Sequence, residues 1–364
     1  MSLIHQIGLT LIKNVGHAYA KKLLDHFGSA EAVFGASRKQ LMEIRGIGKA
    51  TASLILASDA LEQAEKQVVF IEKHGIKVLF YTDNEYPERL RHCPDAPVLL
   101  YYKGNTDLNH PRIISVVGTR NATVYGRKLC QQLAEALAPY DVLIVSGLAY
   151  GIDIAIHKES LQQNIPTVGV MAHGLDRIYP ALHKPLAKKM VGNGGLLTEF
   201  LPGTNPDKEN FPKRNRIIAG LADATVVVEA AVKGGALITA DLANSYDRDV
   251  FAFPGRTNDV YSEGCNLLIG THRAALISHP GDLIYYMGWD EMRIKEEPIE
   301  VTAVPLELSE EEHQVVSVLQ EDALSVDQLA VRSGFSESRL ALHLLNLEMQ
   351  GVLVALPGKV YKLS

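Results

Sequence analysis

Short apolar runs alternate with amphipathic segments through the middle of the chain, from residue 111 to about residue 287. The runs are almost continuously hydrophobic, which is typical of strands buried on both faces of a parallel sheet, and the segments between them have the length of crossover helices. The predicted strands are 113–117, 142–145, 167–171, 195–198, 225–228 and 250–252. The pattern predicts an α/β fold, an extended Rossmann-like doubly wound parallel sheet.

Residues 1–65 have a helical pattern with two glycine-containing turns, at 13–17 and, more sharply, at 44–50. The second turn resembles the helix–hairpin–helix motif, in which a Gly-apolar-Gly turn presents backbone N–H groups to a phosphate. The alternative is a packing turn within a small helical bundle. Residues 66–110 form a connector, in which a helix end and strand at 74–80 and a short strand at 94–101 are predicted to add an edge to the main sheet.

The C-terminal part of the chain has a different pattern. Residues 290–307 are acidic and contain two prolines, which is the composition of a linker. Beyond them, Ser309 precedes three glutamates that suit a helix start, a helix–turn–helix pattern covers 326–340, and a two-stranded wing covers 351–361. We therefore divide the chain into a helical SAM-like/helix-hairpin-helix domain (1–65), the sheet domain (66–289), an acidic linker (290–307) and a winged-helix domain (308–364).

The first predicted strand of the sheet domain ends at a glycine-led corner that carries a basic side chain. Gly118, Thr119 and Arg120 separate the strand from an amphipathic helix pattern. Such a corner lets the backbone approach a ligand, and the helix N-terminus presents unpaired N–H groups, so it suits a phosphate; the alternative is a tight βα turn. The G-x-G-x-x-G pattern is absent and no acid ends the next strand, so neither NAD nor FAD is expected.

A second glycine-rich segment follows the next predicted strand. Ser146 and Gly147 lead through Gly151 to Asp153, which we expect either to cap a helix or to orient Arg120. A nucleophilic role for Ser146 is not favoured, because G-x-S-x-G is missing and no His–acid pair is evident. The glycines are better explained by a close backbone approach to a ligand or to the neighbouring corner.

The fifth predicted strand also ends in polar and glycine-rich sequence. Glu229 ends this buried strand and is expected to form an ion pair with a basic side chain of the site. Lys233, Gly234 and Gly235 then lead into another helix, which makes a further possible phosphate corner. Because the carboxyl ends of parallel strands meet at one sheet edge, several such corners together predict a phosphate site there.

The densest basic cluster, Lys213, Arg214 and Arg216 with Asn215 between them, lies at the start of a predicted helix. The positive end of a helix adds to the attraction of these cations for phosphate. Phe211 offers a face for base stacking, and a basic groove with an interleaved aromatic suits single-stranded nucleic acid. The alternative is a solvated helix start with Phe211 in the core.

Composition excludes several classes of protein. Of the 364 residues, 47% are hydrophobic and 21% are charged, as in ordinary globular domains. No apolar run approaches the ~20 residues of a membrane span, and the N-terminus lacks the pattern of a signal peptide. Cys93, Cys130 and Cys265 are widely spaced, so we expect a reducing cytoplasm with no disulfide framework, metal site or cofactor.

The net charge of −6 is unevenly distributed. Residues 1–110 and 111–289 are each +1, whereas 290–307 and 308–364 are each −4. A basic patch on the first two parts is therefore compatible with a polyanion. The acidity of the predicted winged helix favours contact with protein over contact with duplex DNA.

In order and spacing, these segments resemble the DNA-processing protein A (DprA, also called Smf) family. The matching motifs are V-V-G-T-R-N-A-T-V-Y-G at 116–126, S-G-L-A-Y-G-I-D at 146–153, G-L-D-R-I-Y-P at 174–180, F-P-K-R-N-R-I-I-A-G-L at 211–221, V-E-A with G-G-A-L-I-T-A within 228–240, and V-F-A-F-P-G at 250–255. The resemblance implies a cytoplasmic, dimeric, non-enzymatic protein that binds and protects single-stranded DNA. It also implies loading of the recombinase RecA during natural transformation and homologous recombination.

The resemblance further implies that Arg120 and the basic residues of 213–216 line the DNA pocket, with Lys184 beside them. Thr119 stands where the family usually has serine, and Lys233 stands where it more often has a small polar residue. The full set of candidate DNA-binding residues is Gly118, Thr119, Arg120, Arg127, Ser146, Gly147, Gly151, Lys184, Phe211, Lys213, Arg214, Asn215, Arg216, Lys233, Gly234 and Gly235.

Two other functions are compatible with parts of this sequence. A nucleotide-processing hydrolase of the lysine-decarboxylase-like group would use the same phosphate corner, but the motif P-G-G-x-G-T-x-x-E of that group is incomplete after Gly235. Regulation of duplex DNA by the winged helix is disfavoured by its acidity. The apolar residues 267–269 are expected to form either a self-association patch or the core of an edge strand.

Overall fold

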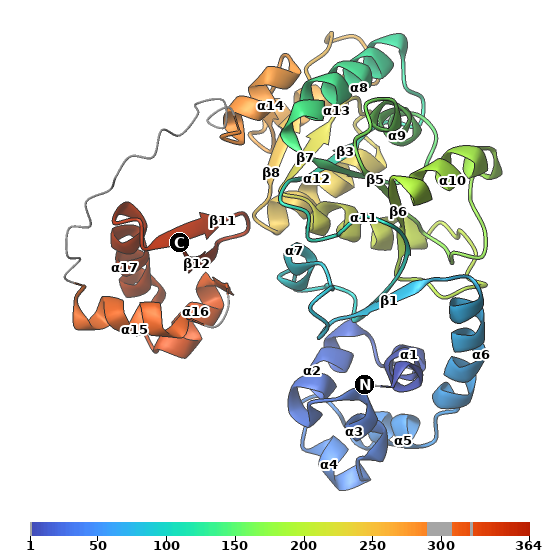
Figure 1. Ribbon diagram of the computed structural model, residues 1–364, viewed down its shortest axis with the longest axis vertical. Coiled ribbons are helices and arrows are strands. Elements are labelled where there is room, and N and C mark those ends of the chain that lie inside the picture. The colour runs from blue at the N-terminus through green and yellow to red at the C-terminus, as the bar shows by residue number, and fades with distance from the viewer. Residues whose placement is uncertain (1, 290–307, 321–322) are drawn as a thin grey trace.

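The computed structural model describes residues 2–289, 308–320 and 323–364 (Figure 1). A nine-stranded sheet lies at its centre, with the strand order β1-β2-β6-β5-β4-β3-β7-β8-β9. The strands are β1 (Lys77–Phe80), β2 (Leu99–Gly104), β3 (Ile113–Val117), β4 (Leu143–Ser146), β5 (Thr167–Val170), β6 (Gly194–Thr198), β7 (Ala224–Val227), β8 (Asp249–Ala252) and β9 (Ala275–Leu276). The six strands predicted for the doubly wound sheet are all present, each within one residue of its predicted bounds.

The connector adds an edge to the sheet, as its sequence predicts, although the second strand is Leu99–Gly104 rather than 94–101. β1 pairs with β2 and β2 pairs with β6, both antiparallel. The rest of the sheet, in the spatial order β6-β5-β4-β3-β7-β8-β9, pairs in parallel. The order reverses between β3 and β7, where the chain leaves β3 first toward β4 and later returns to its other side. In doubly wound sheets, ligands bind at the carboxyl ends of the strands beside such a reversal.

Helices cover both faces of the parallel strands because successive side chains of each strand point to opposite faces. Ile114 and Val116 of β3 pack with one set of helices, and Ile113 and Val117 pack with the other. The first set is α8 (Val124–Leu137), α9 (Ile152–Gln162) and α14 (Pro280–Tyr286), and the second is α11 (Asn210–Leu221), α12 (Gly235–Ser245) and α13 (Glu263–Gly270). Short α7 (Glu88–Arg91) and α10 (Lys184–Gly192) complete the layers, with two 3₁₀ turns at Ala138–Tyr140 and Ala181–His183.

The N-terminal helices pack on the antiparallel extension of the sheet. They are α1 (Leu3–Leu11), α2 (His17–Phe27), α3 (Ala30–Gly35), α4 (Arg38–Met42), α5 (Lys49–Leu56) and α6 (Ala60–Lys73). Their apolar core continues onto Phe80 of β1 and Tyr101 of β2, so the extension serves as the platform for the helical domain. The division we placed after residue 65 falls inside α6.

The C-terminal domain is a winged helix, as its pattern predicts. It consists of α15 (Glu310–Val318), β10 (Leu324–Ser325), α16 (Val326–Ser333), α17 (Glu337–Met349), β11 (Leu353–Leu356) and β12 (Val360–Leu363), with the strand order β10-β12-β11. The turn of the wing contacts the sheet domain, where Arg248 donates to the carbonyl of Pro357 at 2.6 Å. The predicted linker, 290–307, lies outside the described residues.

Residues 267–269 do not form an edge strand. They lie in α13, in which Leu268 is fully buried and Leu267 is 36% exposed, and the edge strand of the sheet is the shorter β9. The difference in burial between Leu267 and Leu268 follows from the 3.6-residue period of this helix and not from the two-residue period of a strand.

Asp223 joins three parts of the sheet domain just before β7. Its carboxylate accepts hydrogen bonds from the backbone N–H of Ile113 at 2.8 Å and from Nε of Arg89 at 2.5 Å, and the side chain is buried. We predict that Asp223→Ala lowers the free energy of unfolding by about 2–4 kcal/mol, because it leaves both donors unpaired in a poorly solvated position.

The matched control is Asp241→Ala, which removes an exposed ion pair with Arg273 and should cost less than about 1 kcal/mol. Urea denaturation followed by circular dichroism measures both variants. Equal stability of the two variants would contradict the role assigned to Asp223.

Candidate nucleic-acid interface

The loops that follow β3 and β4 meet at the carboxyl edge of the sheet, beside the reversal of strand order. The backbone N–H of Ile152 donates to the carbonyl of Thr119 at 3.1 Å, and the N–H of Thr119 donates to the carbonyl of Glu229 at 2.7 Å. A Cβ on Gly118 would lie 2.4 Å from Cγ1 of Ile152. The corner therefore needs glycine so that three chain segments can approach through their backbones.

The second predicted glycine segment is shaped by the same crowding. Gly151 has φ of 82°, and a Cβ there would lie 2.0 Å from the carbonyl oxygen of Thr119. A Cβ on Gly147 would lie 2.3 Å from Oδ2 of Asp153 and 2.4 Å from Nη1 of Arg214. These glycines are required by close contact within the protein, and they bring Arg120 and Arg214 to one side of the sheet edge.

Two guanidinium groups flank the ring of Phe211. The guanidinium carbon of Arg120 lies 5.1 Å from the ring centroid, and that of Arg214 lies 5.9 Å from it. Arg214 is buried and donates to the carbonyl of Val170 and, through Nε, to the side chain of Asn215 at 3.1 Å. Arg120 is exposed, and within the described residues its guanidinium has no hydrogen-bond or ion-pair partner, so its charge is available to a ligand.

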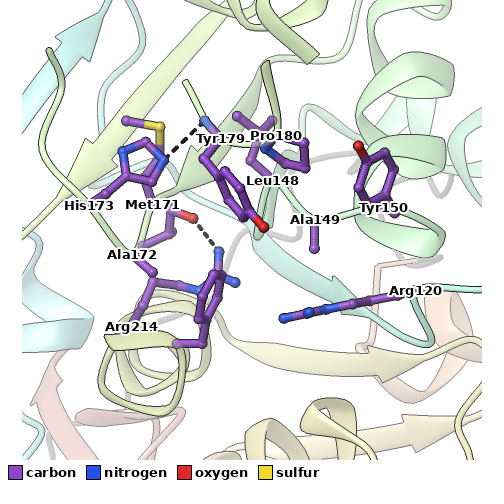
Figure 2. Close-up of a pocket in the computed structure, with 12 residues that line it drawn as sticks. Arg120, Leu148, Ala149, Tyr150, Met171, Ala172, His173, Tyr179, Pro180 and Arg214 are labelled. Carbon is purple, nitrogen blue, oxygen red and sulfur yellow. Dashed lines mark hydrogen bonds between the residues drawn. The ribbon is translucent and has the colours of Figure 1, made fainter. Parts of the chain in front are cut away.

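The first hollow beside these arginines has a volume of about 120 Å³ and is shown in Figure 2. Its aromatic walls are Phe211, Tyr150 and Tyr179, and Met171 and Ala172 from the end of β5 also line it. The rings of Tyr179 and Phe211 are 6.5 Å apart between centroids. An apolar, aromatic hollow next to two cations is suited to an unstacked nucleobase.

Buried histidines support the aromatic walls. Nε2 of His173 accepts a hydrogen bond from the backbone N–H of Tyr179 at 3.2 Å (Figure 2), and Nδ1 of the same ring lies 2.9 Å from the carbonyl of Gly174. Burial lowers the pKa of His173, which favours the neutral ring that this acceptor role needs. On the opposite wall, the ring of Tyr150 packs edge-on against His183 at 4.9 Å.

A second hollow, of about 390 Å³, lies across Arg120 and Phe211 from the first. It is lined by the glycine corner after β3 and by Lys233, Gly234 and Gly235, where Gly234 is the residue that precedes α12. The N-terminus of an 11-residue helix and the exposed ammonium of Lys233 both favour an anion at this position. The structure therefore brings the predicted phosphate corners together in one hollow.

The buried acid of the site lies beside Arg214. Asp153 accepts a hydrogen bond from the backbone N–H of Ala149 at 3.2 Å and does not cap α9, whose N-cap is Gly151. Its carboxylate interacts electrostatically with Arg214 and Arg120. Burial raises the pKa of Asp153, and the nearby Arg214 acts in the opposite direction. Arg120 and Lys233 are the exposed cations that line the second hollow.

His157 is buried beside the site and contacts Gly147 and Thr167. Its Nε2 lies 2.6 Å from the carbonyl of Gly147, and its Nδ1 lies 2.6 Å from Oγ1 of Thr167. Complete burial lowers the pKa of His157 to about 4, so the ring is neutral at physiological pH. It contributes hydrogen bonds and no charge.

Arg216 lies apart from the pocket. Its guanidinium donates to the carboxylate of Glu199 and to the carbonyl of Asp95, and the side chain is buried. Glu199 also lies 2.9 Å from Nε2 of His17, at the start of α2. Arg216 thus connects α11 to the N-terminal helical domain.

Several other candidates also lie outside the two hollows. Lys213 and Lys184 are exposed and line neither hollow, and Arg127 is exposed and donates to the carbonyl of Ala122 at 2.7 Å. Ser146 is buried and donates to the carbonyl of Val116 at 2.6 Å, which is a structural role.

The ion pair predicted for Glu229 is wrong. Its carboxylate accepts hydrogen bonds from the backbone N–H of Thr123 at 3.0 Å and from Oγ1 of the same residue at 2.6 Å. Glu229 therefore lies at the positive N-terminal end of α8, where a helix stabilises an acid without a basic side chain.

The sequence did not single out Tyr150, Tyr179 or Met171 as part of the site. Tyr150 and Tyr179 lie within two of the motifs noted above, S-G-L-A-Y-G-I-D and G-L-D-R-I-Y-P. In the residues that the structure describes, no group of three His, Cys, Asp or Glu side chains is arranged to hold a metal ion. Over the same ranges, none of the helices combines the length and the apolar character needed to cross a membrane.

Family models match all three folded parts of the chain. The model for DNA recombination-mediator protein A matches residues 77–288, that for the DprA winged helix domain matches residues 300–359, and that for a SAM-like helix-hairpin-helix tandem matches residues 7–58. Protein Smf from Synechocystis sp. is 31% identical over 390 residues, covering 96% of each chain. A DNA processing protein DprA from Mycobacterium tuberculosis is 35% identical over 327 residues, covering 86% of this chain and 84% of its own length.

Two solved structures are similar in sequence and in fold. DNA processing protein A from Streptococcus pneumoniae is 33% identical with a TM-score of 0.68, covering 78% of this chain and 98% of that one. The protein from Helicobacter pylori, whose structure was reported for its single-stranded DNA binding mode, is 30% identical with a TM-score of 0.54, covering 59% of this chain and 96% of that one. The chain belongs to the DNA processing protein A (DprA/Smf) family.

Proposed function

We propose that this protein binds single-stranded DNA without regard to sequence, protects it and loads the recombinase RecA onto it in natural transformation and homologous recombination. The observation that carries the proposal is the placement of exposed Arg120 over Phe211, between an aromatic hollow and a glycine-rich phosphate corner. Stacking platforms beside a positively charged groove are the features by which proteins bind single strands of any sequence. The similar protein from Helicobacter pylori, described for its single-stranded DNA binding mode, supports the assignment.

In this proposal, phosphates lie in the second hollow and bases lie in the first. The backbone of the glycine corner, Lys233 and Arg120 hold the phosphate, and the rings of Tyr150, Tyr179 and Phe211 contact a base. Paired bases in a duplex do not offer their faces for such stacking, so the site should prefer single strands. Lys213, Lys184 and Arg127, which are exposed around the hollows, are proposed to contact more distant phosphates.

We further propose that the protein acts in the cytoplasm as a homodimer and without catalysis. The two acids nearest the hollows, Asp153 and Glu229, are already engaged by backbone and side-chain groups of the protein. Binding of DNA is therefore better supported than hydrolysis of a nucleotide in the same corner.

The winged helix is proposed to contact protein rather than duplex DNA. Arg339 of α17 is paired with Glu311 of α15, and the wing is engaged by Arg248 of the sheet domain. The exposed side of α17 carries Leu342, Leu345 and Met349. This apolar surface, in an acidic domain, is unsuited to a DNA backbone.

Arg120→Ala is predicted to weaken binding of fluorescent oligothymidylate by about tenfold or more, because it removes an available cation and one face of the Phe211 stack. Fluorescence anisotropy across a salt series is the measurement, with single- and double-stranded oligonucleotides compared. The variant should also show a shallower salt dependence than the wild-type protein.

Arg273→Ala is the control, because it removes the same charge from an exposed pair on the sheet domain. Equal affinities for Arg120→Ala and Arg273→Ala, or no preference for the single strand in the wild-type protein, would refute the proposed site.

Gly147→Ala is predicted to weaken single-stranded DNA binding by about tenfold or more while the fold is retained. The added Cβ would overlap Asp153 and Arg214, so the arginine and Phe211 must shift. Gly192→Ala is the control, because a Cβ there meets nothing within 4 Å. Anisotropy measures affinity, circular dichroism verifies the fold, and unchanged affinity in Gly147→Ala would count against a site organised around this glycine.

A further inference from the structure

A third hollow lies beyond the phosphate corner, on the side away from the aromatic hollow. It is the largest of the three, at about 1130 Å³, and is formed by the start of α8 and the loop that follows β8. Tyr261 lines both this hollow and the second one, and its hydroxyl accepts a hydrogen bond from Nδ2 of Asn121 at 2.9 Å. The second and third hollows are therefore adjoining parts of one surface.

The three hollows follow the order of the strands across the sheet. The first lies at the carboxyl ends of β4 and β5, the second at those of β3 and β7, and the third at that of β8. Neighbouring strands are about 4.8 Å apart, so the ends of β5, β4, β3, β7 and β8 extend over about 19 Å. A path along this edge is long enough for several nucleotides.

Each hollow combines an aromatic ring with an exposed or partly exposed cation. The third has Tyr125 and Tyr261 as its rings and Arg256 as its cation. Tyr125 is 44% exposed and is fixed by a hydrogen bond from its hydroxyl to the carbonyl of Pro254 at 2.9 Å. Arg256 is exposed, and its guanidinium has no hydrogen-bond or ion-pair partner within the described residues, as is also the case for Arg120.

The lining of the third hollow contains two acids, Glu229 and Asp259. Glu229 lies at its floor, but both of its carboxylate oxygens accept hydrogen bonds from Thr123 at the start of α8. Asp259 is the other acid, in the loop after β8. Val124 and Val260 are 77% and 60% exposed, so the wall is apolar as well as aromatic. This composition suits bases better than phosphates.

We propose that the third hollow is a second base-binding subsite, into which the same single strand continues after the phosphate corner. The inference rests on the proposed function, since it extends that site along the sheet edge. Tyr125 and Tyr261 stack with bases, and Arg256 contacts the phosphate that follows. The strand thus runs from Tyr179, past Arg120 and Lys233, to Arg256.

The test compares oligothymidylates of about four and about twelve nucleotides by fluorescence anisotropy. Tyr125→Leu and Arg256→Ala should each weaken binding of the longer oligonucleotide by about fivefold or more, and should leave the shorter one, bound at Arg120 and Phe211, within about twofold of the wild-type protein. The salt slope for the longer oligonucleotide should fall in Arg256→Ala by about 0.7.

Two matched controls separate stacking and charge from damage to the fold. Tyr125→Phe keeps the ring and loses the hydrogen bond to Pro254, so it should bind the longer oligonucleotide almost as the wild-type protein does. Arg273→Ala removes the same charge from a site outside the path and should leave both affinities unchanged.

Each contrary outcome has a distinct meaning. If Tyr125→Leu and Arg256→Ala bind the longer oligonucleotide normally, or change only self-association in analytical ultracentrifugation, the third hollow is not a DNA subsite, while the Arg120 site stands. If they weaken both oligonucleotides equally, the separate subsite is likewise refuted. If the wild-type protein binds neither oligonucleotide, the proposed function fails, and the extension fails with it.

Discussion

The backbone contact between the loop after β3 and the loop after β4 governs the geometry of the whole site. The N–H of Ile152 donates to the carbonyl of Thr119, and the approach depends on Gly118 and Gly151, which have no Cβ to prevent it. Arg120 follows directly, so its side chain extends from a backbone fixed on both sides. This backbone needs no further ordering when a ligand binds, and preorganisation of this kind raises affinity without new contacts.

Burial divides the charges of the site into two groups with different tasks. Arg214 and Asp153 are buried together, and their opposite charges limit the cost of removing them from water. Arg214 packs against the ring of Phe211 and donates a hydrogen bond to the carbonyl of Val170 at the end of β5, so it stabilises the site. Arg120 and Lys233 remain solvated and unpaired among the described residues, so they supply the attraction for a polyanion. A chain of net charge −6 can therefore carry a positive site, because its acidity is concentrated after residue 289.

The sheet could be predicted from the sequence because its strands are buried on both faces. Runs such as Ile113–Val117 are hydrophobic without interruption, and this signal depends only on local composition. The glycine corners were predictable for a similar reason, since the carboxyl ends of parallel strands share one edge. Phe211 was predicted as a stacking face, but the two tyrosine walls were not predictable, because Tyr150 and Tyr179 reach the hollow through loops that contact His183 and His173. Those contacts depend on packing between segments that are far apart in the sequence.

The period of an α-helix predicts which residues of α11 face the site. A helix turns 100° per residue, so Phe211, Arg214, Asn215 and Ile218 share one face, and all four line the second hollow. Arg216 is rotated by about 200° from Arg214, and accordingly it points to the opposite side, toward Glu199 and the helical domain. The basic cluster therefore has two functions on two faces, although its residues are adjacent in the sequence.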